Sequence, residues 1–566
     1  MNDEQSPAQP PSGEAASGAT ASGDGLRIDH FRQILLWPVH LMPLGDGEAI
    51  QDYGTHVANG GPDNQWREVA DEFTGDPAEF QERHYNEFVT FLPAVQRFLY
   101  GQGLGKAVRR GYGESPIRLL RRHDVAQVRV TLSAGGPPIL FNIAHVDLYF
   151  FFDIDVAMLA LEIHADDVPL EVAQETMFQF GRAYPAYWGE DGRAGHCPQR
   201  VEWLSQQGQV LAVSDYENRQ KFLSFACQHR APCVAAHWEF LLKPLVLHHT
   251  DQKGPVRYRQ LEYYRMPLMA YFAMERPERL TRADNVRLAL ASGSGDSNKL
   301  PLGETYFDDF KAQHCYDRFQ NSIDGRDWSS TNYWSCGLSF VVTGDVKNRF
   351  FVDTERGFLA RFRHQHFLLF LIAHFHRAAL QMFSDRLAGA VSRLDVSDVV
   401  AVQAFRRETR QELEAFLRFT HRYWFPEISD QAQTRDLFAL CRRHLGLDRL
   451  YEDIRQEVQD MSQYLESEAM RRQNETVVRL TVVTTFGLIG TIVTGFLGMN
   501  LFNWSGQEPA IKFLLFLAVV APVLLLTLYT VKKSRRLSEF LDALADDSLG
   551  FKGKWQAFWR IWRVAG

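Results

Sequence analysis

Two long apolar segments near the C-terminus constrain this chain most strongly. Residues 477–499 carry one charged side chain, Arg479, and residues 510–531 carry one, Lys512. About 20 apolar residues in a helix are enough to cross the hydrocarbon core of a bilayer. Core helices of soluble proteins seldom stay apolar on every face over this length. We therefore expect two membrane-spanning helices, joined by a short loop over 500–509.

Basic residues on both sides of this hairpin predict its orientation. The first segment is preceded by Arg471 and Arg472, and the second is followed by Lys532, Lys533, Arg535 and Arg536. The loop itself has no Lys or Arg. Because positively charged residues beside a span stay on the cytoplasmic side, we expect both termini in the cytoplasm and the loop outside.

The rest of the chain has the composition of a folded, soluble body. The whole chain of 566 residues is 45% hydrophobic and 23% charged, and its mean hydropathy of −0.26 excludes a protein made mostly of membrane helices. A net charge of −8 lacks the basic excess of a nucleic-acid binder, so no nucleic-acid partner is expected. Residues 1–25 are rich in Ser, Ala, Gly and Pro, which predicts a disordered tail and no secretory signal.

Local patterns predict an α+β cytoplasmic domain over 26–396. Alternation over 128–132 is typical of a strand. Further expected elements are strands at 146–152 and 154–164, a helix from Val168, and a long helix at 357–387. A helical region with a stalk is expected over 397–476. In the stalk, apolar residues recur every three or four positions, at Leu450, Ile454, Val458, Met461 and Leu465. Because neither Gly nor Pro interrupts it, one helix is expected from Asp448 through the first span.

The first span ends in Gly498-Met499-Asn500. This tripeptide at the outer end of the first of two C-terminal spans, after a long helix and before a basic cluster, resembles the signature of the CorA-type magnesium transporter family. The resemblance covers about 425–536. It implies a homopentamer in the inner (plasma) membrane of a bacterium. The first spans would line the pore, and Asn500, with Gly498 and Met499, would form the selectivity filter.

The resemblance also implies pore-lining positions along the first span. Counting back from Asn500, they hold Gly495, Thr491, Leu488, Leu480, Val477 and Asn474. Thr491 and Asn474 match the family's polar pore residues, and Leu488, Leu480 and Val477 match its apolar gate positions, although Met is more usual at the last. Spacings of 3, 3, 8, 3, 4 and 5 keep these positions broadly on one helical face. The span also carries Thr481, Thr484, Thr485 and Thr494.

The outer loop departs from the family. Magnesium-transporting members often carry an acidic residue two places after the motif, where this chain has Phe502. Glu508 is the one loop carboxylate. It is a candidate for a cation-attracting outer ring, or else an ordinary solvated side chain. The zinc-transporting branch also has a diverged loop, so the identity of the ion stays open.

Three further groups of residues are candidate ion sites, each with a plain structural alternative. Possible zinc ligands are Cys227, His229, Cys233 and His237, of which the last three would share a helical face. Histidines that flank an apolar helix are His364, His366, His374 and His376. Carboxylates that could bind regulatory Mg²⁺ are Asp147, Asp153, Asp155, Asp166, Asp167, Asp308 and Asp309. None stands out, so the regulatory site is unknown.

The region after the second span, 532–566, begins with the basic cluster and ends in an aromatic pattern. Trp555, Phe558, Trp559 and Trp562 share one helical face among basic residues. Such a helix is suited to an anionic lipid surface, and docking on the cytoplasmic domain is the alternative.

We interpret the chain as a CorA-like pentameric channel with an α+β cytoplasmic domain, a long stalk helix and two C-terminal transmembrane helices. The expected cargo is a divalent cation, Mg²⁺ first, which is also a possible regulatory ion; no other cofactor is expected. No nucleophile, base and orienting group form a recognisable set, so the chain is not expected to be an enzyme. The alternatives are a zinc-transporting member, with or without proton coupling, and a membrane-anchored sensor or scaffold without flux.

Overall fold

The computed structural model describes residues 25–42, 53–61, 64–69, 80–101, 116–254, 256–262, 264–317, 331–395, 399–498 and 508–532. The chain divides into two compact units, which are described separately. The first comprises 1–401 with 411–455, and the second comprises 402–410 with 456–566.

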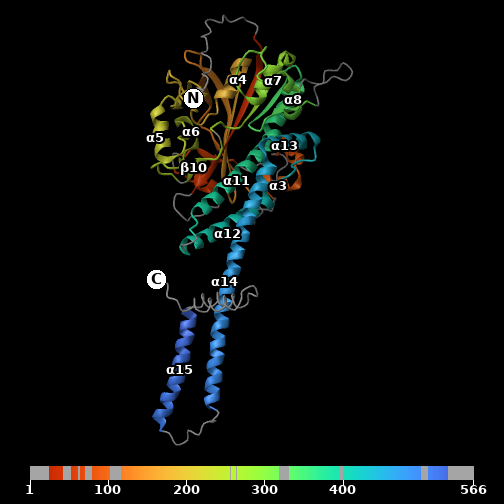
Figure 1. Ribbon diagram of the computed structural model, residues 1–566. Coiled ribbons are helices and arrows are strands. Elements are labelled where there is room, and N and C mark those ends of the chain that lie inside the picture. The colour runs from red at the N-terminus through yellow and green to blue at the C-terminus, as the bar shows by residue number, and fades with distance from the viewer. Residues whose placement is uncertain are drawn as a thin grey trace, which may run out of the picture. The chain divides into compact units, whose positions relative to one another are not determined.

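The first unit is built on one mixed sheet, in which the described residues form fourteen strands (Figure 1). They are β1 (Arg27–Met42), β2 (Trp66–Glu68), β3 (Ile117–Arg122), β4 (Gln127–Thr131), β5 (Ile139–Phe151), β6 (Ile154–Pro169), β7 (Arg200–Leu204), β8 (Val210–Val213), β9 (Val246–Leu247), β10 (Arg257–Gln260), β11 (Leu268–Met274), β12 (Cys315–Tyr316), β13 (Asn332–Ser335) and β14 (Ser339–Asp345). The main path runs β12-β13-β14-β11-β1-β6-β5-β4-β7-β8. Pairs are antiparallel except β11 with β14 and β9 with β10.

The described residues also form fifteen α-helices. They are α1 (Tyr53–Ala58), α2 (Glu82–Thr90), α3 (Pro93–Tyr100), α4 (Leu170–Gln179), α5 (Arg219–His229), α6 (Ala236–Leu242), α7 (Arg282–Leu290), α8 (Phe307–His314), α9 (Arg349–Val352), α10 (Phe358–Arg361), α11 (Phe367–Ser392), α12 (Val399–Arg422), α13 (Ala432–Leu445), α14 (Leu447–Gly498) and α15 (Pro509–Lys532). A π-helix, Phe362–His366, joins α10 to α11.

The long central strand β1 is buried on both faces, which explains why its sequence is apolar with little alternation. Leu35 and Trp37 point toward the helices α4 and α6, and the Trp37 ring lies 6.1 Å from that of Trp238. Side chains one position along a strand point to the opposite face. That face carries Glu162 of β6, which pairs with Arg363 of the π-helix at 2.8 Å. The sheet is therefore a middle layer between two layers of helices.

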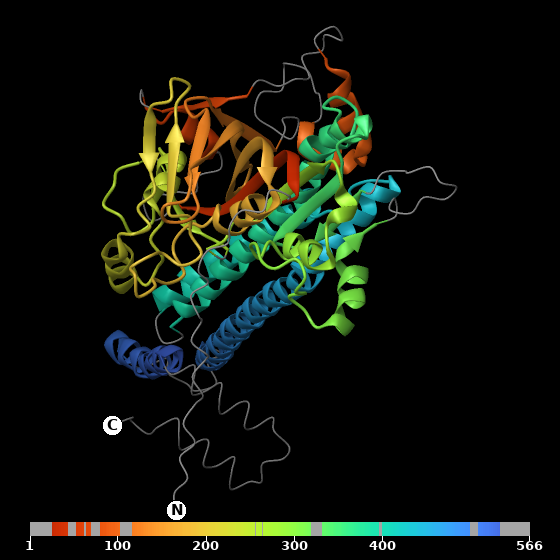
Figure 2. The ribbon, with the colours of Figure 1, turned by 90° about the horizontal axis from the view of Figure 1, so that it is seen from above.

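Helix α11 packs along this second face, as Figures 1 and 2 show. Its Phe375 ring stacks on Phe151 of β5 at 3.8 Å. Among the described residues, the stretch 358–392 is the one helix long and apolar enough to cross a membrane by length and composition, but 83% of its most apolar window is buried inside the protein. It is therefore the core helix of this unit.

Helices α12, α13 and α14 follow the sheet. Pro426 lies in the break between α12 and α13, as expected for a residue that cannot continue a helix. Gly446 ends α13 in the left-handed conformation, at φ 64°, where a residue without a Cβ has no steric penalty. Helix α14 then runs unbroken for 52 residues, as the absence of Gly and Pro predicts for its first half. In the expected seam, Ile454 and Val458 are buried.

Candidate functional site

The expected pore positions form one exposed stripe along α14. The described members are Asn474, Val477, Leu480, Leu488, Thr491 and Gly495, all exposed. At 3.6 residues per turn they fall within an arc of about 120°. Val477, Leu480 and Leu488 are 54%, 64% and 62% exposed. Gly498 is the last residue of α14, whereas Met499 and Asn500 lie outside the described residues.

Helix α15 is also apolar and exposed. Phe513, Leu514 and Leu525 are each at least 65% exposed. Apolar surface costs about 25 cal/mol for each Å² left in water, and large exposed apolar areas mark a membrane or a protein interface. Further copies of the chain or lipid must therefore cover these side chains.

The threonines on α14 present oxygen acceptors. The hydroxyl of Thr491 donates to the carbonyl of Gly487 at 2.9 Å, and that of Thr484 donates to Leu480 and Thr481. A hydroxyl has one proton and two lone pairs, so a side chain that donates to its own helix keeps acceptor capacity. The water shell of a hydrated cation points its hydrogens outward. These hydroxyls therefore suit a hydrated metal ion.

Small residues on α14 leave room for close contact between helices. A Cβ atom built on Gly487, Gly495 or Gly498 would meet nothing within 4 Å. Small residues let the backbones of membrane helices approach. This part of α14 can therefore pack against a copy of itself.

Glu508 has a local structural role in addition to its possible role as an outer ring. Its backbone carbonyl accepts from the amide of Ile511 at 3.0 Å, immediately before Pro509 begins α15. A carboxylate at this position is stabilised by the partial positive charge of a helix N-terminus, and a Pro at the first helical position is common. The side chain is exposed.

The start of α14 is anchored in the first unit by a ring stack. Tyr451 stacks on Trp424 at 4.4 Å with an interplanar angle of 11°. The guanidinium of Arg442 lies over the same Trp424 ring and donates to the carbonyl of Phe425 at 2.6 Å. Arg442 also pairs with Asp448 in the first turn of α14. The base of the helix is therefore attached to the loop that separates α12 from α13.

A buried carboxyl lies close to the same junction. Glu262 is 3.1 Å from Arg377 of α11, and Arg377 donates to the carbonyl of Leu445 at the end of α13 at 3.4 Å. Burial raises the pKa of Glu262 to about 7, and the positive charge of Arg377 opposes this shift.

The structure does not bring the candidate zinc ligands together. Helix α5 ends at His229, and Arg230 adopts the left-handed conformation at φ 51°, so His229, Cys233 and His237 do not share a helical face. Cys233 and His237 are buried, whereas Cys227 is exposed. Throughout the described ranges, no group of three or more His, Cys, Asp or Glu side chains could hold a metal ion.

The histidines around α11 are core residues. His366, His374 and His376 are buried. His374 and His376 face the carbonyls of Gly337 and Tyr423 at 3.1 and 2.5 Å. Burial lowers the pKa of each of the three rings to about 3, so they are neutral at pH 7.

Most of the candidate carboxylates are already paired with basic side chains. The pairs are Asp147 with Arg121, Asp153 with Arg418 and Arg422, Asp155 with Arg386, Asp166 with His30, and Asp167 with Arg27. Asp308 and Asp309 lie exposed in the first turn of α8. The paired carboxylates thus hold elements of the first unit together.

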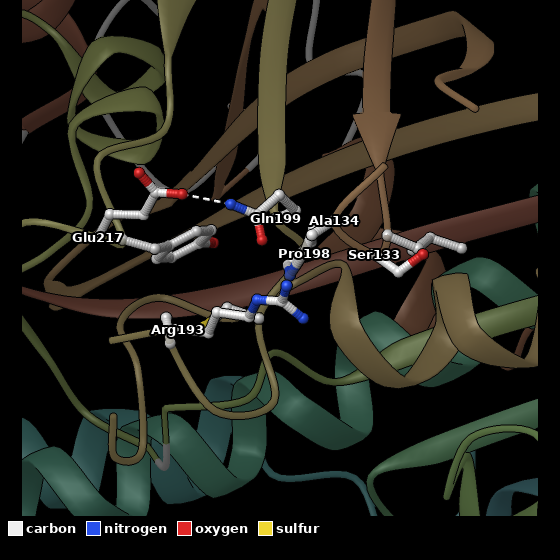
Figure 3. A pocket seen from close by; sticks show the side chains of 10 residues that line it. Ser133, Ala134, Arg193, Pro198, Gln199 and Glu217 are labelled. Atoms are coloured by element: carbon white, nitrogen blue, oxygen red, sulfur yellow. Dashed lines mark hydrogen bonds between the residues drawn. The ribbon is translucent and has the colours of Figure 1, made fainter. Parts of the chain in front are cut away.

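A pocket of about 150 Å³ lies where the strands β4 and β7 meet their loops (Figure 3). Gln199 donates to Glu217 in its wall, and Arg193 pairs with Asp191 at 3.2 Å. Burial raises the pKa of the Cys197 thiol to about 12, so this sulfur stays protonated at pH 7. The lining shows no activated nucleophile.

Two further predictions lie outside the described residues. They are the disordered tail, apart from Gly25, and the aromatic amphipathic helix at the end of 532–566. Both remain predictions.

One comparison with known proteins identifies a family. Residues 374–533 match the family model described as CorA-like Mg²⁺ transporter protein. No curated protein and no solved structure matches the chain. The matched range begins within α11 and includes α12 to α15, so it contains the exposed stripe of α14 and the junction at its base.

Proposed function

Through residues 374–533 the chain belongs to the CorA-like Mg²⁺ transporter family, and from this premise we propose that it carries a divalent cation, Mg²⁺ first, across the bacterial inner membrane. The path is a pore lined by α14 and closed laterally by α15. The observation that carries this proposal is the exposed stripe on α14, with apolar positions at Leu480 and Leu488 and a hydroxyl at Thr491.

One hairpin of two helices cannot enclose water, so several copies must surround the pore. The family resemblance implies five. The glycines of α14 support close packing of neighbouring copies because nothing occupies the space next to them. In this arrangement the exposed leucines and phenylalanines of α15 face lipid.

The proposed filter is a ring of Asn500 carboxamides at the outer end of α14. Mg²⁺ is small and loses water slowly, so neutral oxygen acceptors can position the hydrated ion without removing its shell. Binding must also be weak enough for the ion to leave. Rings of Leu480 and Leu488 would close the pore by excluding water when it narrows. A potential of 100 mV supplies about 4.6 kcal/mol for a divalent cation.

The anchored base of α14 offers a route for regulation from the cytoplasmic body. Tyr451 and Trp424 stack closely, and the helix continues without a break to Gly498. A change in the body that moves this stack would therefore reach the pore through a rigid element. The regulatory ligand remains open.

Uptake by proteoliposomes tests the proposal. Purified full-length protein is reconstituted, and entry of Mg²⁺, Zn²⁺, Co²⁺ and Ni²⁺ is measured with and without a negative-inside potential. We expect potential-driven Mg²⁺ entry, with lost or altered selectivity in Asn500→Ala at an unchanged oligomeric mass. Asn503→Ala, in the same loop, is the matched control. Equal flux in Asn500→Ala and wild type would contradict the filter assignment.

The zinc-transporting branch is the second candidate, and Phe502 favours it because the outer loop lacks the acidic residue often found at that position. Entry of Zn²⁺ without Mg²⁺ in the same assay would support it. No entry of any ion would instead favour a membrane-anchored sensor or scaffold.

A further inference from the structure

The expected pore positions leave the hydroxyls between Leu480 and Leu488 without a role, and Thr484 is the one that lies midway between these two apolar positions. The expected pore positions omit the two turns between Leu480 and Leu488, which are eight residues apart. Thr484 lies four residues from each, and its direction falls within the same arc of about 120° on the helix. Its side chain is exposed.

We propose that Thr484 lines the pore as a ring of hydroxyl acceptors between the apolar rings of Leu480 and Leu488, and holds the water shell of the passing cation there. This proposal rests on the proposed function of α14 as the pore helix.

The hydrogen bonds of Thr484 fit this role. Its hydroxyl lies 2.9 Å from the carbonyls of both Leu480 and Thr481. The single proton is therefore directed into the helix, and lone pairs remain toward the exposed side. A hydrated cation offers only donors from its water shell, so a ring of acceptors is complementary to it. A ring of donors would repel the same shell.

The position of Thr484 also matters for wetting. Eight residues of helix separate Leu480 from Leu488 by about 12 Å. A wholly apolar stretch of this length would favour an empty, non-conducting pore. A hydroxyl ring at the midpoint divides it into two apolar stretches of about 6 Å each. Thr484 would therefore sustain water in the open pore while the leucine rings still close it when it narrows.

Thr494 supplies a matched control. Its hydroxyl makes the same pair of bonds, to Gly490 at 2.9 Å and Thr491 at 3.1 Å. Around the axis of α14, the Thr494 side chain points about 80° away from that of Thr484 and lies outside the arc of the stripe. Replacing either Thr by Val removes the hydroxyl and keeps the shape of the side chain. A difference in uptake between the two variants therefore shows that the side of the helix on which the hydroxyl lies matters.

The experiment compares Mg²⁺ uptake by proteoliposomes of wild type, Thr484→Val, Thr484→Ser and Thr494→Val. We expect Thr484→Val to slow uptake about tenfold, which corresponds to about 1.4 kcal/mol on the barrier. Thr484→Ser and Thr494→Val should stay within about twofold of wild type, a difference of under about 0.5 kcal/mol. Uptake at the wild-type rate by Thr484→Val would overturn the proposal, although the function of the pore would stand. Absence of uptake by wild type would overturn both.

A second measurement covers the case in which Thr484→Val does not assemble. Cysteines introduced by Thr484→Cys and Thr494→Cys are treated with a water-soluble, positively charged thiol reagent. Block of uptake in the first variant alone supports the proposal, and equal sensitivity or block of the second alone overturns it.

Discussion

Acid is expected to destabilise the first unit at a pH at which most proteins are stable, because α11 and the π-helix before it bury three neutral histidines. Burial lowers the pKa values of His366, His374 and His376 to about 3, against about 6.5 in an unfolded chain. Between these values the unfolded state binds more protons than the folded state. Stability is therefore complete above pH 6.5 and falls as the pH falls toward 3.

The magnitude follows from the same values. At pH 5 each ring costs about 2 kcal/mol, so the three together cost about 6 kcal/mol. Buried Glu262 acts in the opposite direction, because its raised pKa makes protonation favour the folded state, but it returns only about 2 kcal/mol between pH 7 and pH 5. The net loss is a large part of the 5–15 kcal/mol by which native proteins are stable.

Thermal unfolding of the full-length protein in detergent, from pH 7.5 to pH 5, measures this loss. Tryptophan fluorescence reports on the body because Trp37 and Trp203 are buried and both contact Trp238. In His374→Gln the amide can still donate toward Gly337, so between pH 7.5 and pH 5 the variant should lose about 2 kcal/mol less stability than the wild type. A Tm that stays constant over this pH range, or a His374→Gln profile parallel to wild type, would refute the reasoning.

Three further predictions concern the junction and the pore. Glu262→Gln should steepen the loss of stability as the pH falls from 7 to 4.5, because it removes a carboxyl whose protonation favours the folded state; an unchanged pH profile of Tm would contradict this. Tyr451→Ala should lower the free energy of unfolding by at least about 1 kcal/mol through loss of the stack on Trp424, measured by denaturant unfolding, and no change would exclude an anchoring role. Leu488→Ser should raise Mg²⁺ uptake by proteoliposomes because an apolar ring of the gate becomes polar, and Leu480→Ser should act in the same direction; wild-type rates in both would rule out a gate.

These stability effects limit how flux is measured. A proton-coupled mechanism is tested with a pH gradient, and an acidic solution on the side of the body would destabilise the body and so obscure any effect on the pore. The pH on that side is therefore best kept above 6.5, with the opposite side made acidic.

Local sequence patterns predicted the helices and strands that depend on residues close together in the sequence. The uninterrupted run after Asp448 predicted the long helix α14. Alternation predicted β4 within one residue, because strand patterns repeat every two positions. The strands β5 and β6 were also predicted, but β5 begins seven residues before its expected start and β6 ends five residues after its expected end.

The pairing of distant segments was not predictable in the same way. β1 pairs with β6 from Arg27 opposite Pro169 onward, and nothing near Arg27 specifies a partner 142 positions away. Charge pairs such as Glu162 with Arg363 depend on that register. Because β1 is buried on both faces, its sequence also lacks the alternation of apolar and polar residues that marks a strand with one exposed face.

The candidate site divides in the same way. Thr491 and Leu488 could be assigned to the pore from the family resemblance, by counting positions back from Asn500. The role proposed for Thr484 depends in addition on its direction on the helix and on its two hydrogen bonds. The proposed zinc ligands failed because His229 ends its helix, and a helical face assumed from spacing does not exist beyond that point.

Cysteine scanning of α14 during uptake tests most directly whether this helix lines a cation path. Single cysteines replace stripe positions, as in Leu480→Cys, Leu488→Cys and Gly495→Cys, or off-stripe positions, as in Val482→Cys and Ile489→Cys, in a chain without its six native cysteines. A charged, water-soluble thiol reagent is then applied while Mg²⁺ enters proteoliposomes. The account predicts block at the stripe positions and none at the off-stripe positions. Block that ignores the helical period, or no block at the stripe, would contradict it.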